Sequence, residues 1–150
     1  MKQRVFLVED QRRMRELLID LFSSTGDFQV VGTACTEAEA LQWLDAHGDA
    51  WDLAVVDLVL DEGSGTHVVQ RAREANYGGL VAVLSTCVTE SLREHVYALG
   101  ADTLFDEKDT TRFLRWLSRL GKPYDAPMSG GRKEVMVAAA TRPSSIRLSA

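Results

Sequence analysis

The sequence predicts an α/β fold with one five-stranded parallel sheet and helices on both of its faces. Short apolar runs alternate five times with segments whose apolar residues recur at helical spacing. The runs are apolar throughout, which is typical of strands buried on both faces, and strands separated by helices need crossover connections that make them parallel. With 150 residues, 45% of them hydrophobic, the chain is long enough to bury one core without a metal or a disulfide.

The first strand is predicted at residues 5–8, an apolar run that ends at Glu9. A helix follows, because five apolar residues recur at the spacing i, i+3, i+4, i+7 and i+8 and so form one stripe. These residues are Met14, Leu17, Leu18, Leu21 and Phe22. Gly26 and Asp27 interrupt the pattern, and residues 28–34 are predicted to form the second strand.

Thr36 is a suitable N-cap for a second helix, which we expect to run through Ala46. Residues 53–56 are predicted to form the third strand, which again ends at an acidic residue. Gly63 and Gly65 are expected to bracket a loop. Three apolar residues then mark the third helix: Val68, Val69 and Ala72.

The most hydrophobic run, residues 80–84, is predicted to be a central strand. The fourth helix carries an apolar stripe of Leu92, Val96 and Leu99, and Gly100 ends it. Residues 102–105 form a weaker strand. The last helix carries the apolar residues Phe113, Leu114, Trp116, Leu117 and Leu120.

Composition divides the chain near residue 121. Residues 1–120 contain 12 Lys and Arg against 20 Asp and Glu, a net charge of −8, whereas residues 121–150 contain 5 against 2, a net charge of +3. All three prolines lie in the second part. We therefore expect a compact domain over residues 1–120 and a basic, largely flexible tail with Pro, Gly and Ser over residues 121–150.

The same numbers exclude several function classes. An acidic domain is a poor surface for nucleic acid, because neutralisation of phosphates drives that binding. No apolar run is long enough for a membrane span, and none follows the N-terminus as in a signal peptide. The two cysteines suggest no disulfide framework or metal cluster. We expect a cytoplasmic protein.

Polar side chains follow the predicted strands at the edge where ligands bind in open parallel sheets. They are Glu9 and Asp10 after the first strand, Asp57 after the third, Ser85 and Thr86 after the fourth, and Lys108 after the fifth. Clustered carboxylates repel one another and need a cation, and hard oxygen ligands favour Mg²⁺. Beside Mg²⁺, an Asp carboxylate can attack phosphorus while the cation, the ammonium and a hydroxyl absorb the charge of the transferred group.

Six short segments lie in a fixed order along the chain. They are Val8-Glu9-Asp10, Val55-Val56-Asp57, Gly65, Leu84-Ser85-Thr86, Gly100-Ala101-Asp102 and Lys108. In this order they resemble the receiver domains of two-component response regulators, including the single-domain, CheY-like receivers. The resemblance covers about residues 3–120, and its specificity comes from the ordered set rather than from any one segment. It implies a flavodoxin-like (βα)5 three-layer sandwich whose five-stranded parallel sheet has the order 2-1-3-4-5.

The resemblance also implies roles for individual residues. Asp57 would accept a phosphoryl group from a phosphohistidine on a sensor histidine kinase or a histidine phosphotransfer protein. Asp10 and Asp57 would bind Mg²⁺, and Glu9 would bind it through water. Ser85 would contact a phosphoryl oxygen, and Lys108 would pair with the phosphoryl group.

Signalling would use Ser85, Thr86 and an aromatic switch residue. Phe105 fits the switch by its distance to Lys108, whereas Leu104 fits by its distance from Gly100. A downstream effector protein would read the signal by contact, with no nucleic-acid or membrane partner, and a homodimer is left open. The resemblance implies no enzymatic activity beyond transfer to Asp57 and hydrolysis from it.

The sequence departs from the family pattern at several positions. The proline often found four residues after the acceptor is Asp61, which adds a negative charge, and the proline that often follows the lysine is Asp109. The interval from Gly100 to Lys108 is one residue longer than usual, because Glu107 is interposed. A bulge could absorb the extra residue, or the lysine could be displaced.

Two functional alternatives follow from particular residues. A degenerate receiver that binds partners without phosphorylation is favoured by Asp61 and the shifted Lys108. A phosphatase with an Asp nucleophile fits poorly, because that family has a second Asp where this chain has Val59. For a receiver domain, the resemblance implies that the side chains at Val59 and Cys87 tune loss of the phosphoryl group. Neither can orient water well, which predicts a long-lived phospho-Asp57.

Overall fold

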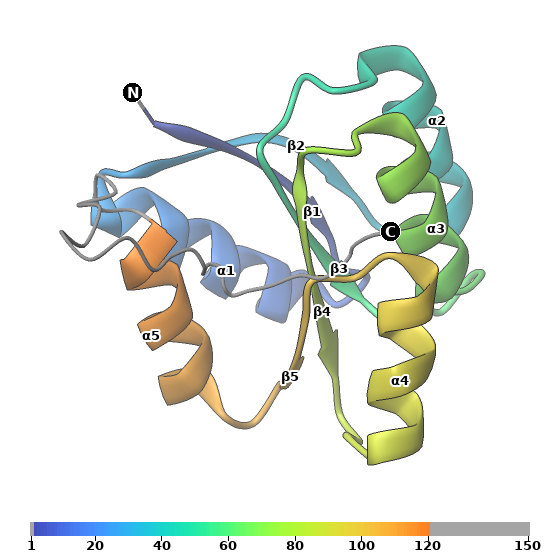
Figure 1. The fold of residues 1–150 in the computed structure, drawn as a ribbon. Coiled ribbons are helices and arrows are strands. Elements are labelled where there is room, and N and C mark those ends of the chain that lie inside the picture. The colour runs from blue at the N-terminus through green and yellow to red at the C-terminus, as the bar shows by residue number, and fades with distance from the viewer. Residues whose placement is uncertain (1, 121–150) are drawn as a thin grey trace, which may run out of the picture.

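The computed structural model describes residues 2–120 of the chain. The described part contains five strands and five helices in strict alternation (Figure 1). In chain order they are β1 (Gln3–Val8), α1 (Arg12–Thr25), β2 (Phe28–Ala34), α2 (Glu37–His47), β3 (Leu53–Asp57), α3 (Gly65–Ala75), β4 (Leu80–Ser85), α4 (Glu90–Leu99), β5 (Thr103–Asp106) and α5 (Thr110–Leu120). The predicted tail, residues 121–150, lies outside the described residues.

The strands form one parallel sheet in the order β2-β1-β3-β4-β5. This order confirms the predicted flavodoxin-like sheet. The run at residues 80–84 lies inside the sheet between β3 and β5, so it is covered on both edges as predicted. No helix within residues 2–120 has the length and apolar character needed to cross a membrane.

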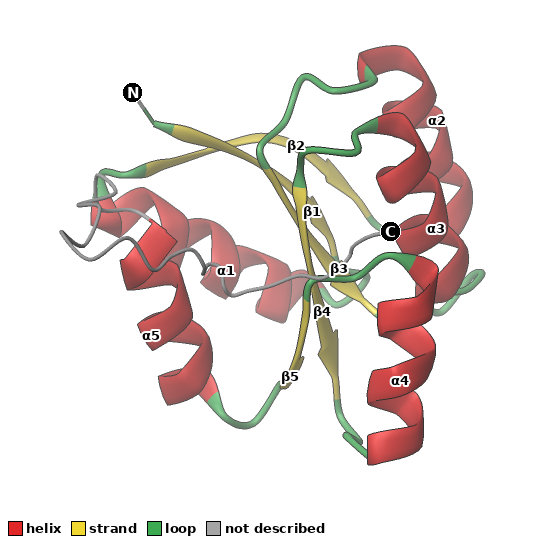
Figure 2. Ribbon diagram, viewed as in Figure 1, coloured by secondary structure: helices red, strands yellow, loops and turns green. Residues whose placement is uncertain are grey.

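Two apolar layers lie on the two faces of the sheet, between the strands and the helices drawn in red in Figure 2. Helices α1 and α5 cover one face, and α2, α3 and α4 cover the other (Figure 1). Successive residues of a strand point to opposite faces, so Val5 and Leu7 pack with α1 and α5, whereas Phe6 and Val8 pack on the opposite side. All four are completely buried, which explains why the strands are apolar without alternation.

The loop predicted between Gly63 and Gly65 ends one residue earlier than expected. Helix α3 begins at Gly65, and the Ser64 side chain caps it by accepting from the backbone N–H of Thr66. A Cβ at Gly65 would lie 2.3 Å from the carbonyl oxygen of Asp57. Gly65 is therefore part of the helix, and its lack of a side chain lets the helix start pack against the end of β3.

The predicted Thr36 cap is confirmed, since its hydroxyl accepts from the backbone N–H of Glu39. At the other end of the sequence, β5 extends one residue further than predicted, to Asp106, which pairs with Ser85. Asp109 then accepts from the backbone N–H of Arg112 at the start of α5. An Asp in the place of the family's proline therefore caps the last helix.

Candidate acidic site at the carboxyl edge of the sheet

Three carboxylates meet where β1 and β3 end. Glu9, Asp10 and Asp57 each place one carboxylate oxygen within 4.8 Å of the other two. Val8 pairs with Val56 in the parallel register, so the residues that follow these strands lie side by side. The structure thus brings together the three residues predicted to bind a cation.

Glu9 is the most buried member, with 1% of its surface exposed. Its Oε2 accepts from the backbone N–H of Gln11, but its Oε1 has no hydrogen-bond partner among the described residues. Burial, followed by the charge of Asp57, raises the pKa of Glu9 to about 8. A buried carboxylate oxygen without a donor needs either a proton or a cation, so the donor set fits a hard divalent ion such as Mg²⁺.

Asp57 ends β3 and is 5% exposed. Its Oδ1 accepts from the backbone N–H of Val59 at 3.2 Å. Burial is the main cause that raises the pKa of Asp57, and the charge of Asp10 acts in the same direction. Asp57 therefore combines what a carboxylate nucleophile needs, a fixed orientation and a neighbourhood that favours bound positive charge.

The loop between β3 and α3 adds a fourth carboxyl group to this edge. The backbone N–H of Asp61 donates to Asp10 Oδ2 at 2.9 Å. The charge of Asp10 raises the pKa of the exposed Asp61 carboxyl group. The extra negative charge expected from Asp61 thus lies beside the predicted metal ligands.

Ser85 ends β4 and is buried beside this edge, with 4% of its surface exposed. Its hydroxyl donates to the carbonyl oxygen of Cys87 at 3.0 Å and accepts from the backbone N–H of the same residue at 3.2 Å. It does not cap α4, because Thr89 has that role. Thr86, the other predicted hydroxyl, is exposed.

Lys108, the predicted partner of the phosphoryl group, forms no ion pair with the carboxylates of this edge among the described residues. It is exposed, and within residues 2–120 its ammonium makes no hydrogen bond or ion pair. Its backbone N–H donates to Asp106 Oδ1, and the N–H of Asp109 donates to the carbonyl oxygen of Asp106. These bonds place Lys108 in a tight turn between β5 and α5.

Phe105 packs on the α5 side of the sheet. Its ring centroid lies 5.4 Å from that of Phe113 and 5.6 Å from that of Trp116. Leu104 is buried on the opposite face, in the cluster that also contains Val96 of α4. The two candidates for the switch position thus belong to different layers, and only Leu104 contributes to the core under α4.

Glu107 also lies at this edge, although the sequence pattern predicts no role for it. Its backbone N–H donates to the carbonyl oxygen of Ser85 at 2.9 Å, directly beyond the last pair of β5. Burial, followed by the charges of Asp57 and Asp10, raises the pKa of its carboxyl group. The one-residue lengthening before Lys108 was the signal that could have identified it.

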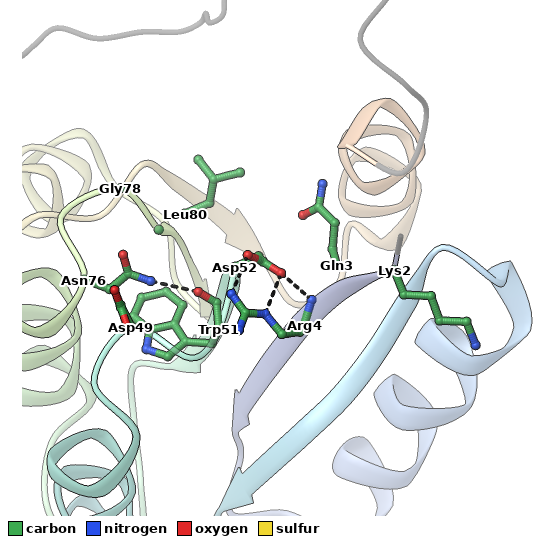
Figure 3. A pocket seen from close by; sticks show the side chains of 10 residues that line it. Lys2, Gln3, Arg4, Asp49, Trp51, Asp52, Asn76, Gly78 and Leu80 are labelled. Carbon is green, nitrogen blue, oxygen red and sulfur yellow. Dashed lines mark hydrogen bonds and ion pairs between the residues drawn. The ribbon is translucent and has the colours of Figure 1, made fainter.

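A hollow at the opposite edge of the sheet contains none of these residues. Figure 3 shows its lining from the amino ends of β1, β3 and β4, where Arg4 binds Asp52 and Asn76 donates to the carbonyl oxygen of Trp51. Two of its four charged residues, Arg4 and Asp52, form an ion pair. The crowded carboxylates of the carboxyl edge therefore mark the better candidate for chemistry.

Comparison with known proteins gives one family match. A family model described as the response regulator receiver domain matches residues 5–111. Comparison with curated protein sequences finds no match.

Several solved structures share the fold. The NarL receiver domain from Mycobacterium tuberculosis is 23% identical, with a TM-score of 0.69 over 82% of this chain and 98% of that one. CheY in a CheX-CheY-BeF3-Mg complex from Borrelia burgdorferi is 20% identical, with a TM-score of 0.71 over 81% and 90% of the two chains. A LuxR-family response regulator from Aurantimonas sp. SI85-9A1 is 18% identical, with a TM-score of 0.71 over 81% and 86%.

Proposed function

The chain belongs to the family of response regulator receiver domains, and we propose that it accepts a phosphoryl group on Asp57 with Mg²⁺ as cofactor. The observation that carries the proposal is the meeting of Glu9, Asp10 and Asp57 within 4.8 Å at the carboxyl edge of the sheet. Among the described residues no basic side chain forms an ion pair with these carboxylates, so a bound cation would stabilise their negative charge.

Three residues would hold Mg²⁺: Asp10 and Asp57 directly, and Glu9 through water. The unpartnered Oε1 of Glu9 supports its place in the set. Bound there, the ion would neutralise the charge that an incoming phosphoryl group brings to an acidic pocket. The complex of Borrelia burgdorferi CheY with BeF3 and Mg is consistent with such a site in a protein of the same fold.

The chemical step is an in-line displacement. An Asp57 carboxylate oxygen attacks the phosphorus of a phosphohistidine, the new O–P bond forms as the P–N bond breaks, and the bonding pair returns to the imidazole nitrogen of the donor. The backbone N–H of Val59 keeps the carboxylate oriented during attack. The Ser85 hydroxyl would leave Cys87 and donate to a phosphoryl oxygen, which couples occupancy of Asp57 to the β4–α4 loop.

Receiver domains work with kinases and effectors. We place the donor, a sensor histidine kinase or a histidine phosphotransfer protein, at the carboxyl edge, where its phosphohistidine can reach Asp57. A downstream effector protein would read the rearranged β4–α4 loop, with Ser85 and Thr86 at its start. Leu104 is the better placed of the two switch candidates, because it packs under α4.

Phosphoryl acceptance is the test. The full chain is incubated with acetyl phosphate, with and without Mg²⁺, and its intact mass is measured. We expect one Mg²⁺-dependent phosphoryl gain in the wild type and none in Asp57→Asn. Asp52→Asn, which removes a carboxylate at the opposite edge, is the matched control and should retain the gain.

A second outcome would favour the degenerate receiver. No phosphoryl gain in a wild type that is folded would contradict acceptance on Asp57. The exposed position of Lys108 is the observation that favours this alternative, because within residues 2–120 its ammonium forms no ion pair with the carboxylates of the site.

A further inference from the structure

The turn after β5 determines which residue lies beside the acidic site. Asp106 pairs with Ser85, and the backbone N–H of Glu107 continues the ladder by donating to the carbonyl oxygen of Ser85 at 2.9 Å. The chain then leaves the sheet, because Asp106 accepts from the backbone N–H of both Lys108 and Asp109. Glu107 is thus the last residue held against the carboxyl edge.

Burial and charge distinguish Glu107 from its neighbour. Glu107 is partly buried and Lys108 is exposed. Burial, followed by the charges of Asp57 and Asp10, raises the pKa of the Glu107 carboxyl group. The charge of Glu107 in turn contributes to the raised pKa of Glu9. No ion pair joins Lys108 to a carboxylate anywhere in residues 2–120.

We propose that Glu107, and not Lys108, is the residue of the β5–α5 turn that faces the acidic site, and that its carboxylate strengthens divalent-cation binding while slowing transfer of an anionic phosphoryl group. The claim about cation binding is supported by the cluster of Glu9, Asp10 and Asp57 and by the buried Oε1 of Glu9, which has no hydrogen-bond partner among the described residues. The claim about phosphoryl transfer rests on the function proposed above. Glu107 would thereby tune the specificity of the site without being its nucleophile.

The physical reason is the sign of the charge. A carboxylate near a divalent cation attracts it, and the same carboxylate repels the equatorial oxygens of a phosphoryl group. A lysine in that place would do the reverse in both respects. With Glu107 in that place, the turn attracts cations rather than anions, and phosphoryl transfer to Asp57 depends more strongly on the bound Mg²⁺.

The test measures cation binding and phosphoryl transfer separately. Mg²⁺ binding is measured by calorimetry on the full chain for the wild type, Glu107→Gln, Glu107→Asp and Lys108→Gln. We expect Glu107→Gln to weaken binding about tenfold, with Glu107→Asp retaining most of the affinity and Lys108→Gln within about twofold of the wild type. Thermal melts of each variant establish that it is folded.

Phosphoryl transfer from acetyl phosphate is then measured at saturating Mg²⁺. Glu107→Gln should accelerate it about tenfold, and Lys108→Gln should change it by less than about twofold. A loss of tenfold or more in Lys108→Gln, with Glu107→Gln unchanged in both assays, would overturn the inference and leave the proposed function standing. Weaker Mg²⁺ binding in Glu107→Gln without phosphoryl gain in any variant would support the claim about cation binding and contradict the proposed function.

Discussion

The two edges of the sheet differ in whether their acidic side chains are paired with basic ones. At the carboxyl edge, five acidic side chains gather around the ends of β1, β3 and β5 with no basic side chain paired to them within residues 2–120: Glu9, Asp10, Asp57, Asp61 and Glu107. At the amino edge, Asp52 binds Arg4 through both carboxylate oxygens at 3.1 Å (Figure 3). Asp102 likewise binds Arg73 at 2.6 Å.

The difference is visible in the pKa values. Burial raises the pKa of Glu9 and of Asp57, so the folded chain resists ionisation of these groups. The hydrogen bond from Arg4 lowers the pKa of Asp52, so folding favours its ionised form. The amino edge is therefore an assembly that stabilises the fold, whereas the carboxyl edge stores electrostatic repulsion that a cation can relieve.

Removing Arg73 should produce the largest change of all. Its guanidinium donates to Asp102 and also to four backbone carbonyl oxygens, those of Asn76, Tyr77, Gly79 and Gly100. Arg73→Ala removes the donor of four backbone carbonyl oxygens and the ion pair with Asp102, whose Oδ2 still accepts from the backbone N–H of Val81. We expect a loss of about 3 kcal/mol or more in the free energy of unfolding, measured by urea denaturation.

Arg4→Ala is the matched control at the same edge. Its ion pair with Asp52 is 44% and 40% exposed on the two sides, so the loss should be at most about 1 kcal/mol. Equal losses in the two variants would show that the Arg73 network does not hold the amino edge together.

Glu9→Gln tests the carboxyl edge. In contrast to the arginine variants, it should remove a destabilising effect of ionisation rather than a stabilising contact. The pKa of Glu9 is about 8 in the folded chain against 4.5 as the ordinary value, so the folded state holds an extra proton between these pH values. Stability should therefore fall as pH rises from 5 to 8 without divalent cation, by roughly 2–4 kcal/mol. Glu9→Gln should remove most of this fall, as measured by urea unfolding in EDTA.

Asp52→Asn sharpens the same experiment. The pKa of Asp52 is lowered, so its contribution is present throughout this range and is lost only as pH falls through the lowered pKa. The variant should be less stable than the wild type at both pH 5 and pH 8, and its stability should depend on pH as that of the wild type does. A wild type whose stability rises from pH 5 to 8 would contradict the account of the carboxyl edge.

Gly65→Ala tests the packing that presents Asp57. A Cβ there would lie 2.3 Å from the carbonyl oxygen of Asp57, and backbone atoms cannot move aside cheaply. We expect a loss of about 1–3 kcal/mol by urea unfolding, although Ala is ordinarily the better helix former. Gly78→Ala, where a Cβ meets nothing within 4 Å, should be within about 0.5 kcal/mol of the wild type.

Val59→Asn should give the smallest effect, on the lifetime of phospho-Asp57. Val59 is 68% exposed and Cys87 is also exposed, so water reaches this edge, but neither side chain orients it well. We expect slow phosphate release in the wild type and an acceleration of about tenfold or less in Val59→Asn, followed by intact mass over time. Rapid release from the wild type would contradict the prediction.

The sequence predicted most of the fold and the three clustered carboxylates for one reason. Continuous apolar runs locate buried strands, and the acids that end them must meet where parallel strands end. Neither inference needs side-chain detail, which is why Glu9, Asp10 and Asp57 could be selected from local sequence.

The β5 region could not be predicted in the same way. Whether Glu107 or Lys108 faces the site depends on where the turn leaves the sheet, and a tertiary hydrogen bond to Ser85 fixes that point. Whether Phe105 or Leu104 packs under α4 depends on strand register, where a shift of one residue exchanges the two faces. Both are properties of the neighbouring strand.

The most direct test of the contrast between the edges is a calorimetric Mg²⁺ titration of three proteins: the wild type, Asp57→Asn and Asp52→Asn. We predict that one Mg²⁺ binds the wild type and Asp52→Asn with similar affinity, and that Asp57→Asn loses about tenfold or more. No Mg²⁺ binding to the wild type, or equal binding to the wild type and Asp57→Asn, would contradict the claim that the crowded carboxylates form a cation site.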